Sequence, residues 1–511
     1  MSVALPRSAT VAVIGSGAMG AGIAQVAAAA GHPVLLFDTR PEAVAAALKN
    51  IRAMFGKLAQ KGKMSEADAD AAGARLQAAD SLAALRDAAL VVEAIVENLD
   101  VKRKVFADLE AIVADTCIFA SNTSSISITS IGAALRLPQR LVGMHFFNPV
   151  PLMALVEVIS GLASDAAIAA QVYGTALAWG KNPVHTRSTP GFIVNRVARP
   201  YYAEALRILN EQAADVATID AVLREAGGFR MGPFELMDLI GHDVNFAVTQ
   251  SVFHAYFCDP RFTPSLIQQE LVNAGFLGRK SGRGFYRYES DVNAPQPHTE
   301  TAQTRATAPV VVHGKGKLAQ ALVARLETGG VSVEHASAID NDGALLSCGS
   351  ARLYLTDGRS ATGRARDNQH ADTILLDLTL DFSQATRVAV SRADQCSATA
   401  YAAVVALLQA AGLAVSRLDD VPGMAVMRTV AMLANEAADT VNQGVCTVAD
   451  ADMAMQKGVN YPRGPLAWAD AIGLSRLSTV LGHLAAGYGE DRYRISPLIQ
   501  RKTASGALFH V

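Results

Sequence analysis

The opening segment of the chain restricts the possible fold more than any other part of the sequence. It reads "TVAVIGSGAMGAGIAQVAAAAGHPVLLFDTR", with Gly15, Gly17 and Gly20 in a G-x-G-x-x-G pattern between an apolar run and an alanine-rich stretch. A second apolar run follows and ends at Asp38. Strand, glycine turn, helix, strand and terminal acid in this order form the βαβ unit that binds dinucleotides. The sequence therefore predicts a Rossmann-type α/β domain in this region.

The glycine turn and Asp38 predict how a dinucleotide is held. Glycines let the backbone approach a pyrophosphate, and the free N–H groups at the helix N-terminus attract its charge. A carboxylate at Asp38 can accept hydrogen bonds from ribose hydroxyls and repels a 2′-phosphate, which favours NAD over NADP. Arg40 acts in the opposite direction, so the strictness of this preference stays open. The cofactor-binding residues predicted in the turn are Gly15, Gly17, Ala18, Met19 and Gly20.

Composition and charge argue against several functional classes. The chain has 511 residues, which predicts about three or four domains at roughly 150 residues each. Half of the residues are hydrophobic, and the formal net charge is −2, so no basic field indicates nucleic acid or an acidic membrane. The start "MSVALPRSAT" has no apolar run typical of a signal peptide, and five scattered cysteines form no C-x-x-C pair. We therefore expect a cytoplasmic protein without a disulfide framework or structural zinc.

A histidine and a glutamate stand in apolar surroundings in "MHFFNPVPLMALVEV". His145 lies near the end of one predicted strand, prolines follow it, and Glu157 lies within the next strand with valine on both sides. A chain reversal can bring Glu157 beside His145, where a carboxylate fixes the tautomer of the imidazole. A buried acid is costly without a partner, which favours this pairing. The alternative is a core histidine and an unrelated strand acid.

Other polar segments have two interpretations each. The segment "ALKNIRAMFGKLAQKGKM" carries five basic residues and is either a solvated helix face or a site for a polyanion. The loop "SNTSS" either caps a following helix or contacts a ligand. Glu97 and Lys102 lie at a strand–helix junction, where ligands bind in open α/β sheets. "TPGFIVNRVARPYYAEALRILNEQ" predicts a helix with Thr189 as N-cap and Pro190 as first residue, which places Asn195 in its first turns.

Six segments in consecutive order resemble the 3-hydroxyacyl-CoA dehydrogenase family: "GSGAMG", "VVEAIVEN", "SNTSSI", "HFFNPVPLMALVEV", "TPGFIVNR" and "GRKSGRGFY". The resemblance implies oxidation of an (S)-3-hydroxyacyl-CoA to the 3-oxoacyl-CoA, with NAD as cofactor. It also implies that His145 is the general base and Glu157 its partner, with Ser124 and Asn195 at the reacting oxygen. Beyond the glycine turn, the residues that it places along the cofactor are Asp38, Glu97, Lys102, Ser124, Asn148 and Lys280.

The residue types suit this chemistry. A neutral histidine, with an ordinary pKa of about 6.5, can take a hydroxyl proton near neutral pH. Hydroxyl and amide groups can donate hydrogen bonds to an oxygen as negative charge develops on it. The resemblance further assigns Lys57 and Lys61 of the basic segment to the phosphates of an acyl-CoA substrate. No metal is required, and the sequence shows no His/Cys/carboxylate cluster with metal-binding spacing.

The second half of the chain repeats the first. "VVVHGKGKLAQALVARLETGGVSVEHAS" resembles the opening βαβ unit, with Gly314, Gly316 and Ala319 in the glycine positions. The segments 190–241 and 422–473 align without a gap, at an offset of 232. The sequence therefore predicts a tandem duplication.

The second copy is expected to be catalytically inactive. Ser337 replaces Asp38, Met427 replaces Asn195, and no counterpart of "SNTSS" or "HFFNP" is present. The alternative is a second, independent active site. Because members of the family commonly dimerise through the helical domain, we expect the two helical domains to pack together as an internal pseudo-dimer. Further homo-oligomerisation stays open.

The predicted fold is a Rossmann-type α/β domain plus an all-α helical domain, duplicated in tandem with a degenerate second copy. The predicted domains are an NAD-binding domain (1–187), a helical substrate and dimerisation-type domain (188–288), a linker (289–308), a degenerate Rossmann-like domain (309–418) and a second helical domain (419–511). The layout resembles long bacterial family members of phenylacetate breakdown, which act on 3-hydroxyadipyl-CoA, and long 3-hydroxybutyryl-CoA dehydrogenases. The acyl chain length stays open. The alternatives are a dehydrogenase of free hydroxy acids such as L-gulonate, and a non-catalytic binding or structural protein that kept the fold.

Overall fold

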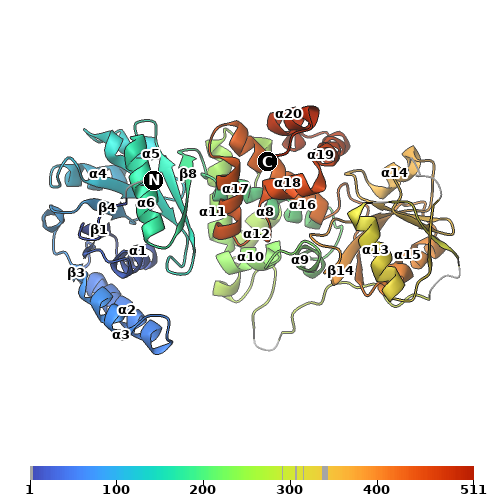
Figure 1. Ribbon diagram of the computed structural model, residues 1–511, viewed down its shortest axis with the longest axis horizontal. Helices are drawn as coiled ribbons and strands as arrows, with labels where there is room; N and C mark the ends of the chain where they lie inside the picture. Colours follow the sequence, from blue (N-terminus) through green and yellow to red (C-terminus); the bar gives the residue numbers. More distant parts are fainter. Residues whose placement is uncertain (1–3, 290–291, 305–307, 315, 337–342, 511) are drawn as a thin grey trace. The chain divides into compact units, whose positions relative to one another are not determined.

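The computed structural model describes residues 4–289, 292–304, 308–314, 316–336 and 343–510, so Ser337 lies outside the described residues. The chain forms two compact units (Figure 1). The first unit contains residues 1–196 and 443–459, and the second contains residues 197–442 and 460–511. In the described parts of the chain, every helix is too short or too polar to cross a membrane.

The described strands of the first unit form one sheet with the order β3-β2-β1-β4-β5-β6-β7-β8. The first six strands are parallel, whereas β7 is antiparallel to β6 and parallel to β8. The strands are β1 (Val11–Ile14), β2 (Val34–Phe37), β3 (Leu76–Ala78), β4 (Leu90–Glu93), β5 (Ile118–Ser121), β6 (Leu141–Phe146), β7 (Leu155–Ser160) and β8 (Asn182–Arg187). With α1 (Ala18–Ala29) between β1 and β2, the predicted βαβ unit is confirmed.

Helices cover both faces of this sheet because its side chains alternate between two hydrophobic cores. In β1, Val11 and Val13 belong to one core, and Ala12 and Ile14 belong to the other. The first core includes α1, α2 (Pro41–Gln60), α3 (Glu66–Ala74) and α6 (Ala166–Ala178), and the second includes α4 (Leu99–Glu110) and α5 (Ile128–Gly132). The short helices are η1 (Leu82–Leu85), η2 (Pro138–Arg140) and α7 (Val194–Val197).

One helix of the first unit comes from the far end of the chain. α17 (Val448–Gly458) packs on β7 and β8, the last two strands of the sheet. The Arg187 N–H donates to the Val445 carbonyl at 2.9 Å, and Arg196 Nη1 donates to Gln443 Oε1 at 2.9 Å. Residues 443–459 therefore complete a unit whose other residues all precede residue 197.

The helix predicted from Pro190 begins later than expected. α7 begins at Val194, because Gly191 (φ 75°) and Phe192 (φ 49°) adopt left-handed backbone that a helix cannot contain. Among the described residues, Thr189 Oγ1 has no hydrogen-bond partner, so its prediction as N-cap was wrong. A distant carboxylate, described below, accepts the N–H groups at this turn instead.

The second unit contains two sets of helices. The first set is α8 (Arg199–Asn210), α9 (Val216–Glu225), α10 (Pro233–Ile240), α11 (His242–Ala255), η3 (Pro260–Phe262), α12 (Leu266–Asn273) and η4 (Arg279–Ser281). The second set is α16 (Val426–Asn442), α18 (Pro465–Ile472), α19 (Leu474–Tyr488), η5 (Asp491–Tyr493) and α20 (Pro497–Ser505). Residues 292–304, in the predicted linker, contain no described helix or strand but are tied to this unit. For example, the Glu300 N–H donates to the Val415 carbonyl at 2.7 Å.

The second unit also contains a smaller sheet with the described order β10-β9-β11-β12-β13-β14-β15. Its strands are β9 (Val310–Val312), β10 (Val333–His335), β11 (Leu346–Cys348), β12 (Ala351–Leu355), β13 (Thr373–Leu376), β14 (Arg387–Arg392) and β15 (Ala414–Arg417). Its helices are α13 (Lys317–Thr328), α14 (Ala361–Asp367) and α15 (Ala398–Ala410). As with β6 and β7 of the first sheet, β13 and β14 are antiparallel, and β14 is parallel to β15.

The offset found in the sequence extends beyond the aligned helices. β14 and α15 begin and end 232 positions after β7 and α6, and α18 does so relative to α10. Strand register agrees as well, since Met144 pairs with Val158 and Leu376 pairs with Val390. The correspondence therefore includes the strands that carry His145 and Glu157.

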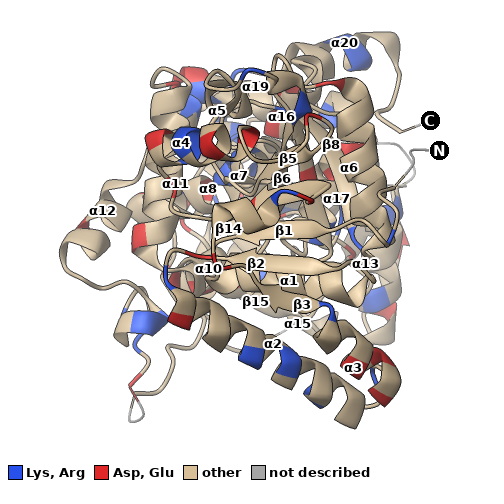
Figure 2. Ribbon diagram, turned by 90° about the vertical axis from the view of Figure 1, so that its left-hand side faces the viewer, with Lys and Arg blue, Asp and Glu red and all other residues tan. Residues whose placement is uncertain are grey.

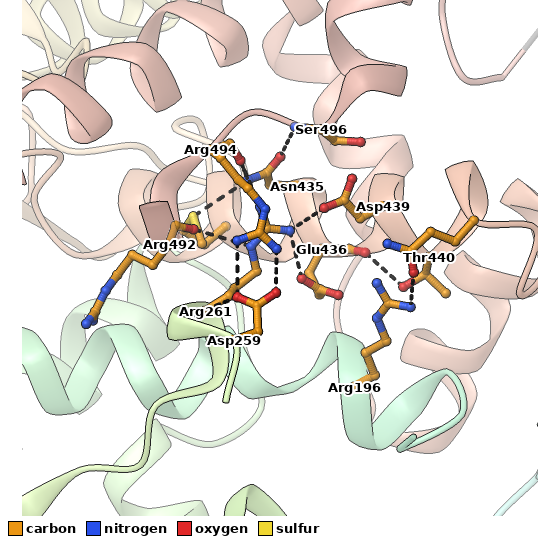
Figure 3. Close-up of polar contacts among 12 residues, drawn as sticks. Arg196, Asp259, Arg261, Asn435, Glu436, Asp439, Thr440, Arg492, Arg494 and Ser496 are labelled. Atoms are coloured by element: carbon orange, nitrogen blue, oxygen red, sulfur yellow. Dashed lines mark hydrogen bonds and ion pairs between the residues drawn. The ribbon is translucent and has the colours of Figure 1, made fainter. Parts of the chain in front are cut away.

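Buried ion pairs connect the two sets of helices within the second unit. Arg261 of η3 bonds Glu436 of α16 at 3.0 Å and also bonds Asp439 (Figure 3). Arg428 of α16 bonds Glu204 of α8 at 2.7 Å, and both side chains are at most 1% exposed. Glu204 and Glu436 are equivalent at the offset of 232, and each receives an arginine from the opposite set of helices.

Candidate active site

The glycine turn after β1 has a shape that requires glycine at two positions. Gly15 has φ +100°, and a Cβ atom there would lie 2.5 Å from the Ala94 carbonyl oxygen. A Cβ atom on Gly20 would lie 1.8 Å from the Gly15 carbonyl oxygen. At Gly17, the N-cap of α1, no described atom lies within 4 Å of the Cβ position, and no side chain caps the helix. The first turn of α1, including Ala18 and Met19, therefore leaves N–H groups available to a pyrophosphate.

Asp38 follows β2 and is hydrogen-bonded to Ser16 of this turn. Its Oδ2 accepts hydrogen bonds from the Ser16 N–H at 2.9 Å and from Ser16 Oγ at 2.8 Å, and its Oδ1 accepts from the Arg40 N–H at 3.1 Å. Partial burial acts to raise the pKa of Asp38, but these hydrogen bonds outweigh it and hold the pKa below its ordinary value. The structure thus fits a dinucleotide at this turn, with an ionised Asp38 beside it. Sequence reasoning did not single out Ser16, which links Asp38 to the glycine turn.

Glu97 holds the serine loop. Its Oε1 atom accepts hydrogen bonds from Thr123 Oγ1 at 2.6 Å, the Ser124 N–H at 3.0 Å and the Ser125 N–H at 3.1 Å. Burial acts to raise the pKa of Glu97, but the hydrogen bonds and the charge of Lys102 outweigh it and lower the pKa. Glu97 therefore fixes the position of Ser124 relative to β4 and β5.

Lys102 is fully buried and paired with two carboxylates. Its Nζ lies 2.6 Å from Glu93 Oε1 and 3.3 Å from Glu97 Oε2. Glu93, at the end of β4, also accepts from Ser121 Oγ at 2.7 Å. Sequence reasoning missed Glu93, although an acid at the end of the apolar strand "LVVE" was the available signal. The cluster joins the ends of β4 and β5 to the start of α4, where the serine loop begins.

His145 and Glu157 are directly opposite each other on β6 and β7. His145 Nδ1 lies 2.7 Å from Glu157 Oε2, and the two side chains are 8% and 0% exposed. Val156 and Val158, which flank Glu157 in sequence, face the opposite hydrophobic core, because alternate residues of a strand point to opposite faces. The apolar neighbours of Glu157 therefore follow from the strand period.

Glu157 also holds the segment that carries Asn195. Its Oε1 accepts hydrogen bonds from the Ile193 and Val194 N–H groups, both at 3.0 Å, at the start of α7. Asn195 Nδ2 lies 3.4 Å from the Ser124 carbonyl oxygen, a long hydrogen bond. One carboxylate thus positions both the imidazole and the helix start, and the structure brings His145, Glu157, Asn195 and the serine loop together within the first unit.

Residues from the far end of the chain lie close to Glu157. Burial raises the pKa of the Cys446 thiol to about 12, and the charges of Asp450 and Glu157 act in the same direction. A Cβ atom on Gly458 would lie 2.6 Å from Leu155 Cδ2, so α17 packs tightly against β7. Sequence reasoning did not place this segment near His145.

The other predicted site residues lie elsewhere. Asn148 is exposed in the loop after β6, and Lys57 and Lys61 are exposed at the C-terminal end of α2. Figure 2 shows the basic residues of α2 along this helix. Lys280 belongs to the second unit, where its Nζ bonds Asp243 at 2.7 Å.

In the second sheet, Asp377 stands 232 positions after His145, and its N–H donates to the carbonyl of Ala389, the equivalent of Glu157. Asp377 Oδ2 accepts hydrogen bonds from the Ala425 and Val426 N–H groups at 2.9 and 2.7 Å. Those two residues are equivalent to Ile193 and Val194. The second sheet therefore keeps a carboxylate at the helix start, supplied from the neighbouring strand, and has no imidazole there.

Comparison with known families gives three matches. The model for the 3-hydroxyacyl-CoA dehydrogenase NAD binding domain matches residues 10–189. The model for the C-terminal domain of the same family matches residues 191–288 and again residues 423–509. A model for a 3-hydroxybutyryl-CoA dehydrogenase reduced Rossmann-fold domain matches residues 353–422.

Similar proteins cover either the whole chain or its first half. The chain is 43% identical to a 3-hydroxyadipyl-CoA dehydrogenase of Escherichia coli (strain K12), over 96% of this chain and 97% of the relative. It is 42% identical to a probable 3-hydroxybutyryl-CoA dehydrogenase of Bacillus subtilis (strain 168), over 54% of this chain and 96% of the relative. The crystal structure of a 3-hydroxybutyryl-CoA dehydrogenase from Escherichia coli K12 superimposes with a TM-score of 0.87 at 41% identity, covering 98% of this chain and 99% of that chain.

Proposed function

The chain belongs to the 3-hydroxyacyl-CoA dehydrogenase family, and from this premise we propose that it oxidises (S)-3-hydroxyacyl-CoA to 3-oxoacyl-CoA with His145 as the general base. The enzyme is an NAD-dependent oxidoreductase. The observation that carries the base assignment is the buried contact between His145 Nδ1 and Glu157 Oε2 at 2.7 Å.

Glu157 gives His145 the tautomer that this role needs. A carboxylate accepts a hydrogen bond, so Nδ1 carries the ring proton and Nε2 is left with a lone pair. Nε2 is the atom that takes the proton of the substrate hydroxyl, and Glu157 then stabilises the imidazolium. Because the same carboxylate holds the N–H groups at the start of α7, its position is fixed from two sides.

Ser124 and Asn195 are proposed to donate hydrogen bonds to the substrate oxygen as negative charge develops on it. NAD⁺, when bound, supplies the hydride acceptor. The residues that would hold it are those of the glycine turn, together with Asp38, Glu97 and Lys102 of the first unit. Asn148 and Lys280 stay predictions from the family resemblance. Lys57 and Lys61, exposed at the end of α2, are proposed to meet the phosphates of coenzyme A.

The substrate is proposed to be 3-hydroxyadipyl-CoA or 3-hydroxybutyryl-CoA, from the names of the relatives that cover nearly the whole chain. Both names describe acyl-CoA substrates and not free hydroxy acids.

We also propose that the second half is a degenerate copy without an active site of its own. Its support is the shared offset of the helices and strands, the repeated family match of the helical domain, and the exchange of His145 for Asp377. The buried ion pairs at the equivalent residues Glu204 and Glu436, each with an arginine of the opposite helix set, support an internal pseudo-dimer of the two helix sets in the second unit.

The test compares His145→Gln with His185→Gln on the full chain. His185 lies on β8 of the same sheet, is exposed, and stacks on Tyr173 with ring centroids 4.5 Å apart. The 3-oxoacyl-CoA reduction rate is followed by NADH absorbance, and NADH affinity by its fluorescence. We expect His145→Gln to lower kcat by about 10²–10⁴-fold with NADH affinity nearly unchanged. His185→Gln should behave as the wild type. Wild-type turnover in His145→Gln would contradict the assignment of His145 as the general base.

A further inference from the structure

Arg199, the first residue of α8, is a buried cation without a carboxylate. It is 5% exposed, and its Nη1 donates to Thr249 Oγ1 at 2.9 Å and to the Asn245 carbonyl at 3.5 Å. Its guanidinium lies 4.9 Å above the Tyr202 ring. Among the described residues, its Nε has no hydrogen-bond partner and no carboxylate oxygen lies within ion-pair distance of its guanidinium.

Other buried arginines of the same unit differ from Arg199 in this respect. Arg261 and Arg428 each bond at least one glutamate in the interior. An unpaired buried charge is unfavourable, and a guanidinium stays protonated in proteins instead of becoming neutral. Burial lowers the pKa of Arg199, and the Tyr202 and Tyr461 hydroxyls counter this only in part. Arg199 thus costs stability unless an anion from outside the chain offsets its charge.

A cavity of about 190 Å³ lies beside Arg199, entirely within the second unit. Three arginines and no aspartate or glutamate stand among its lining residues. The arginines are Arg199, Arg207 and Arg492, and the polar uncharged members include Thr249, Thr263, Ser265 and Gln268. Arg207 is paired with Glu204 at 2.7 Å, and Arg492 is paired with Glu490. Among the described lining residues, Arg199 is therefore the arginine whose charge no carboxylate offsets, and that charge attracts an anion.

The rest of the lining restricts the shape and polarity of such an anion. Leu206, Phe262 and Leu266 give the cavity an apolar portion, and Leu266 is 77% exposed at its rim. The volume lies below the roughly 300–1,000 Å³ of sites for drug-sized ligands. The cavity therefore holds either a small molecule or one end of a larger molecule. Arginines beside aliphatic side chains fit a carboxylate on a short methylene chain better than a fully polar anion such as phosphate.

We propose that this cavity binds a carboxylate at the end of a short aliphatic chain, with Arg199 as its buried counter-ion. The source that we propose is a free dicarboxylate such as adipate. The cavity and its charge do not depend on the proposed function.

Binding is tested on the full chain by calorimetry with adipate, at constant ionic strength, with hexanoate and inorganic phosphate as comparison ligands. The variants are Arg199→Met and, as control, Arg501→Met, which removes an exposed arginine on α20 of the same unit. We expect saturable adipate binding to the wild type and to Arg501→Met, weaker binding of phosphate, and a loss of at least about tenfold in affinity in Arg199→Met. Absence of saturable adipate binding to the wild type, or unchanged affinity in Arg199→Met, overturns the proposal.

Thermal unfolding without ligand separates this role from a purely structural one. Removing an unpaired buried charge should leave Tm of Arg199→Met equal to or above that of the wild type. Adipate should raise Tm of the wild type and of Arg501→Met but not that of Arg199→Met. A lower Tm together with an unchanged response to adipate identifies Arg199 as structural and overturns the proposal. Arg199→Lys, which keeps the charge and loses the planar fork, should bind adipate with intermediate affinity.

Turnover measures whether the bound carboxylate is independent of the substrate. Arg199→Met should lose adipate binding while kcat/KM for 3-hydroxyadipyl-CoA and for 3-hydroxyhexanoyl-CoA stays unchanged. A loss of kcat/KM for 3-hydroxyadipyl-CoA alone would overturn the assignment to a free dicarboxylate. If the dehydrogenase assignment is wrong, the wild type turns over neither thioester. Calorimetry then still measures adipate binding to the cavity, so the two failures can be told apart.

Discussion

Asp377 directly follows β13 of the second sheet and stands 232 positions after His145 of β6, at the offset that relates the aligned helices and strands. It accepts hydrogen bonds from the N–H groups of residues 425–427, as Glu157 does from residues 193–194. In the first sheet the carboxylate has two partners, a helix start and an imidazole. In the second its partners among the described residues are the helix start and the N–H of the adjacent Leu378, and no imidazole is among them. The comparison separates the structural role of this carboxylate from its proposed role in proton transfer.

Glu157→Gln and Asp377→Asn form a matched pair. In Glu157→Gln the amide NH₂ faces His145 and favours the tautomer with the proton on Nε2, so kcat should fall by about 10²–10⁴-fold. Asp377→Asn should lower the free energy of unfolding by about 1–3 kcal/mol, because a backbone N–H loses its acceptor, with kcat within about twofold of the wild type. Steady-state kinetics and urea unfolding measure both. A large loss of kcat in Asp377→Asn would contradict the inactive second copy.

The pH dependence of stability should report on Glu97. Its pKa in the folded protein is lowered, so its stabilising contribution is present above the ordinary glutamate pKa of about 4.3 and is lost as pH falls through the folded value. The difference in unfolding free energy between wild type and Glu97→Gln should stay constant from pH 8 to about 5 and shrink below about 4. Urea unfolding at each pH measures it. A difference that disappears by pH 6 would show that Glu97 is not held as an anion.

Asp38→Ser should relax the preference for NAD. Removing the carboxylate removes the repulsion of a 2′-phosphate, and Arg40 remains nearby to attract it. We expect kcat/KM for NADPH to rise and kcat/KM for NADH to fall by about tenfold or more. Asp68→Ser, at an exposed position in the first turn of α3, serves as control. An unchanged ratio of kcat/KM for NADPH to kcat/KM for NADH would contradict the placement of Asp38 at the ribose.

The buried pair of Arg428 and Glu204 should be strongly coupled. Arg428→Met leaves Glu204 without one of its cationic partners, so the free energy of unfolding should fall by about 3–5 kcal/mol. Adding Glu204→Gln should recover part of this loss, and the double-mutant cycle should give a coupling of at least about 1 kcal/mol. Lys104→Met, in an exposed pair with Asp108, should change stability by less than about 1 kcal/mol. Additive effects of the two buried substitutions would show that the pair does not hold the helix sets together.

A chain that ends at Tyr288 should have a destabilised first unit, because part of that unit comes from the second half of the sequence. It keeps His145 and Glu157 but lacks residues 443–459, which pack on β7 and β8. We expect a lower Tm, binding of a hydrophobic dye and reduced turnover, with partial recovery when the fragment 289–511 is added. A truncated chain that is monomeric, free of dye binding and fully active would contradict both this expectation and the internal pseudo-dimer.

The sequence predicted the first βαβ unit and the proximity of Glu157 to His145 because both depend on local pattern. Glycine spacing defines the turn at Gly15, and strand alternation with an intervening reversal brings the two side chains together. Thr189 failed as N-cap because Glu157, which lies on β7 and well before it in the chain, holds the helix start instead. A local capping rule carries no information about such a contact.

Other features were beyond sequence reasoning for a different reason. The equivalence of Asp377 and His145 lies in a region where the side chains of the two sheets differ and strand register is what the two sheets share. The packing of α17 on β7 depends on which unit a helix joins, and neither periodicity nor capping specifies that choice. The unpaired Arg199 likewise becomes apparent only once its neighbours in space are known.

The contribution of α17 to the first unit has a consequence during translation. When β8 leaves the ribosome, the helix that packs on it has not been synthesised, and at about 5–20 residues per second it follows on the order of tens of seconds later. Through that interval the surface of β7 and β8 on which α17 packs stays uncovered, and chaperones recognise such exposed apolar surface. A premature stop codon before residue 448 would therefore release a polypeptide that contains His145, Glu157, Ser124 and Asn195 and still lacks the last layer of their domain.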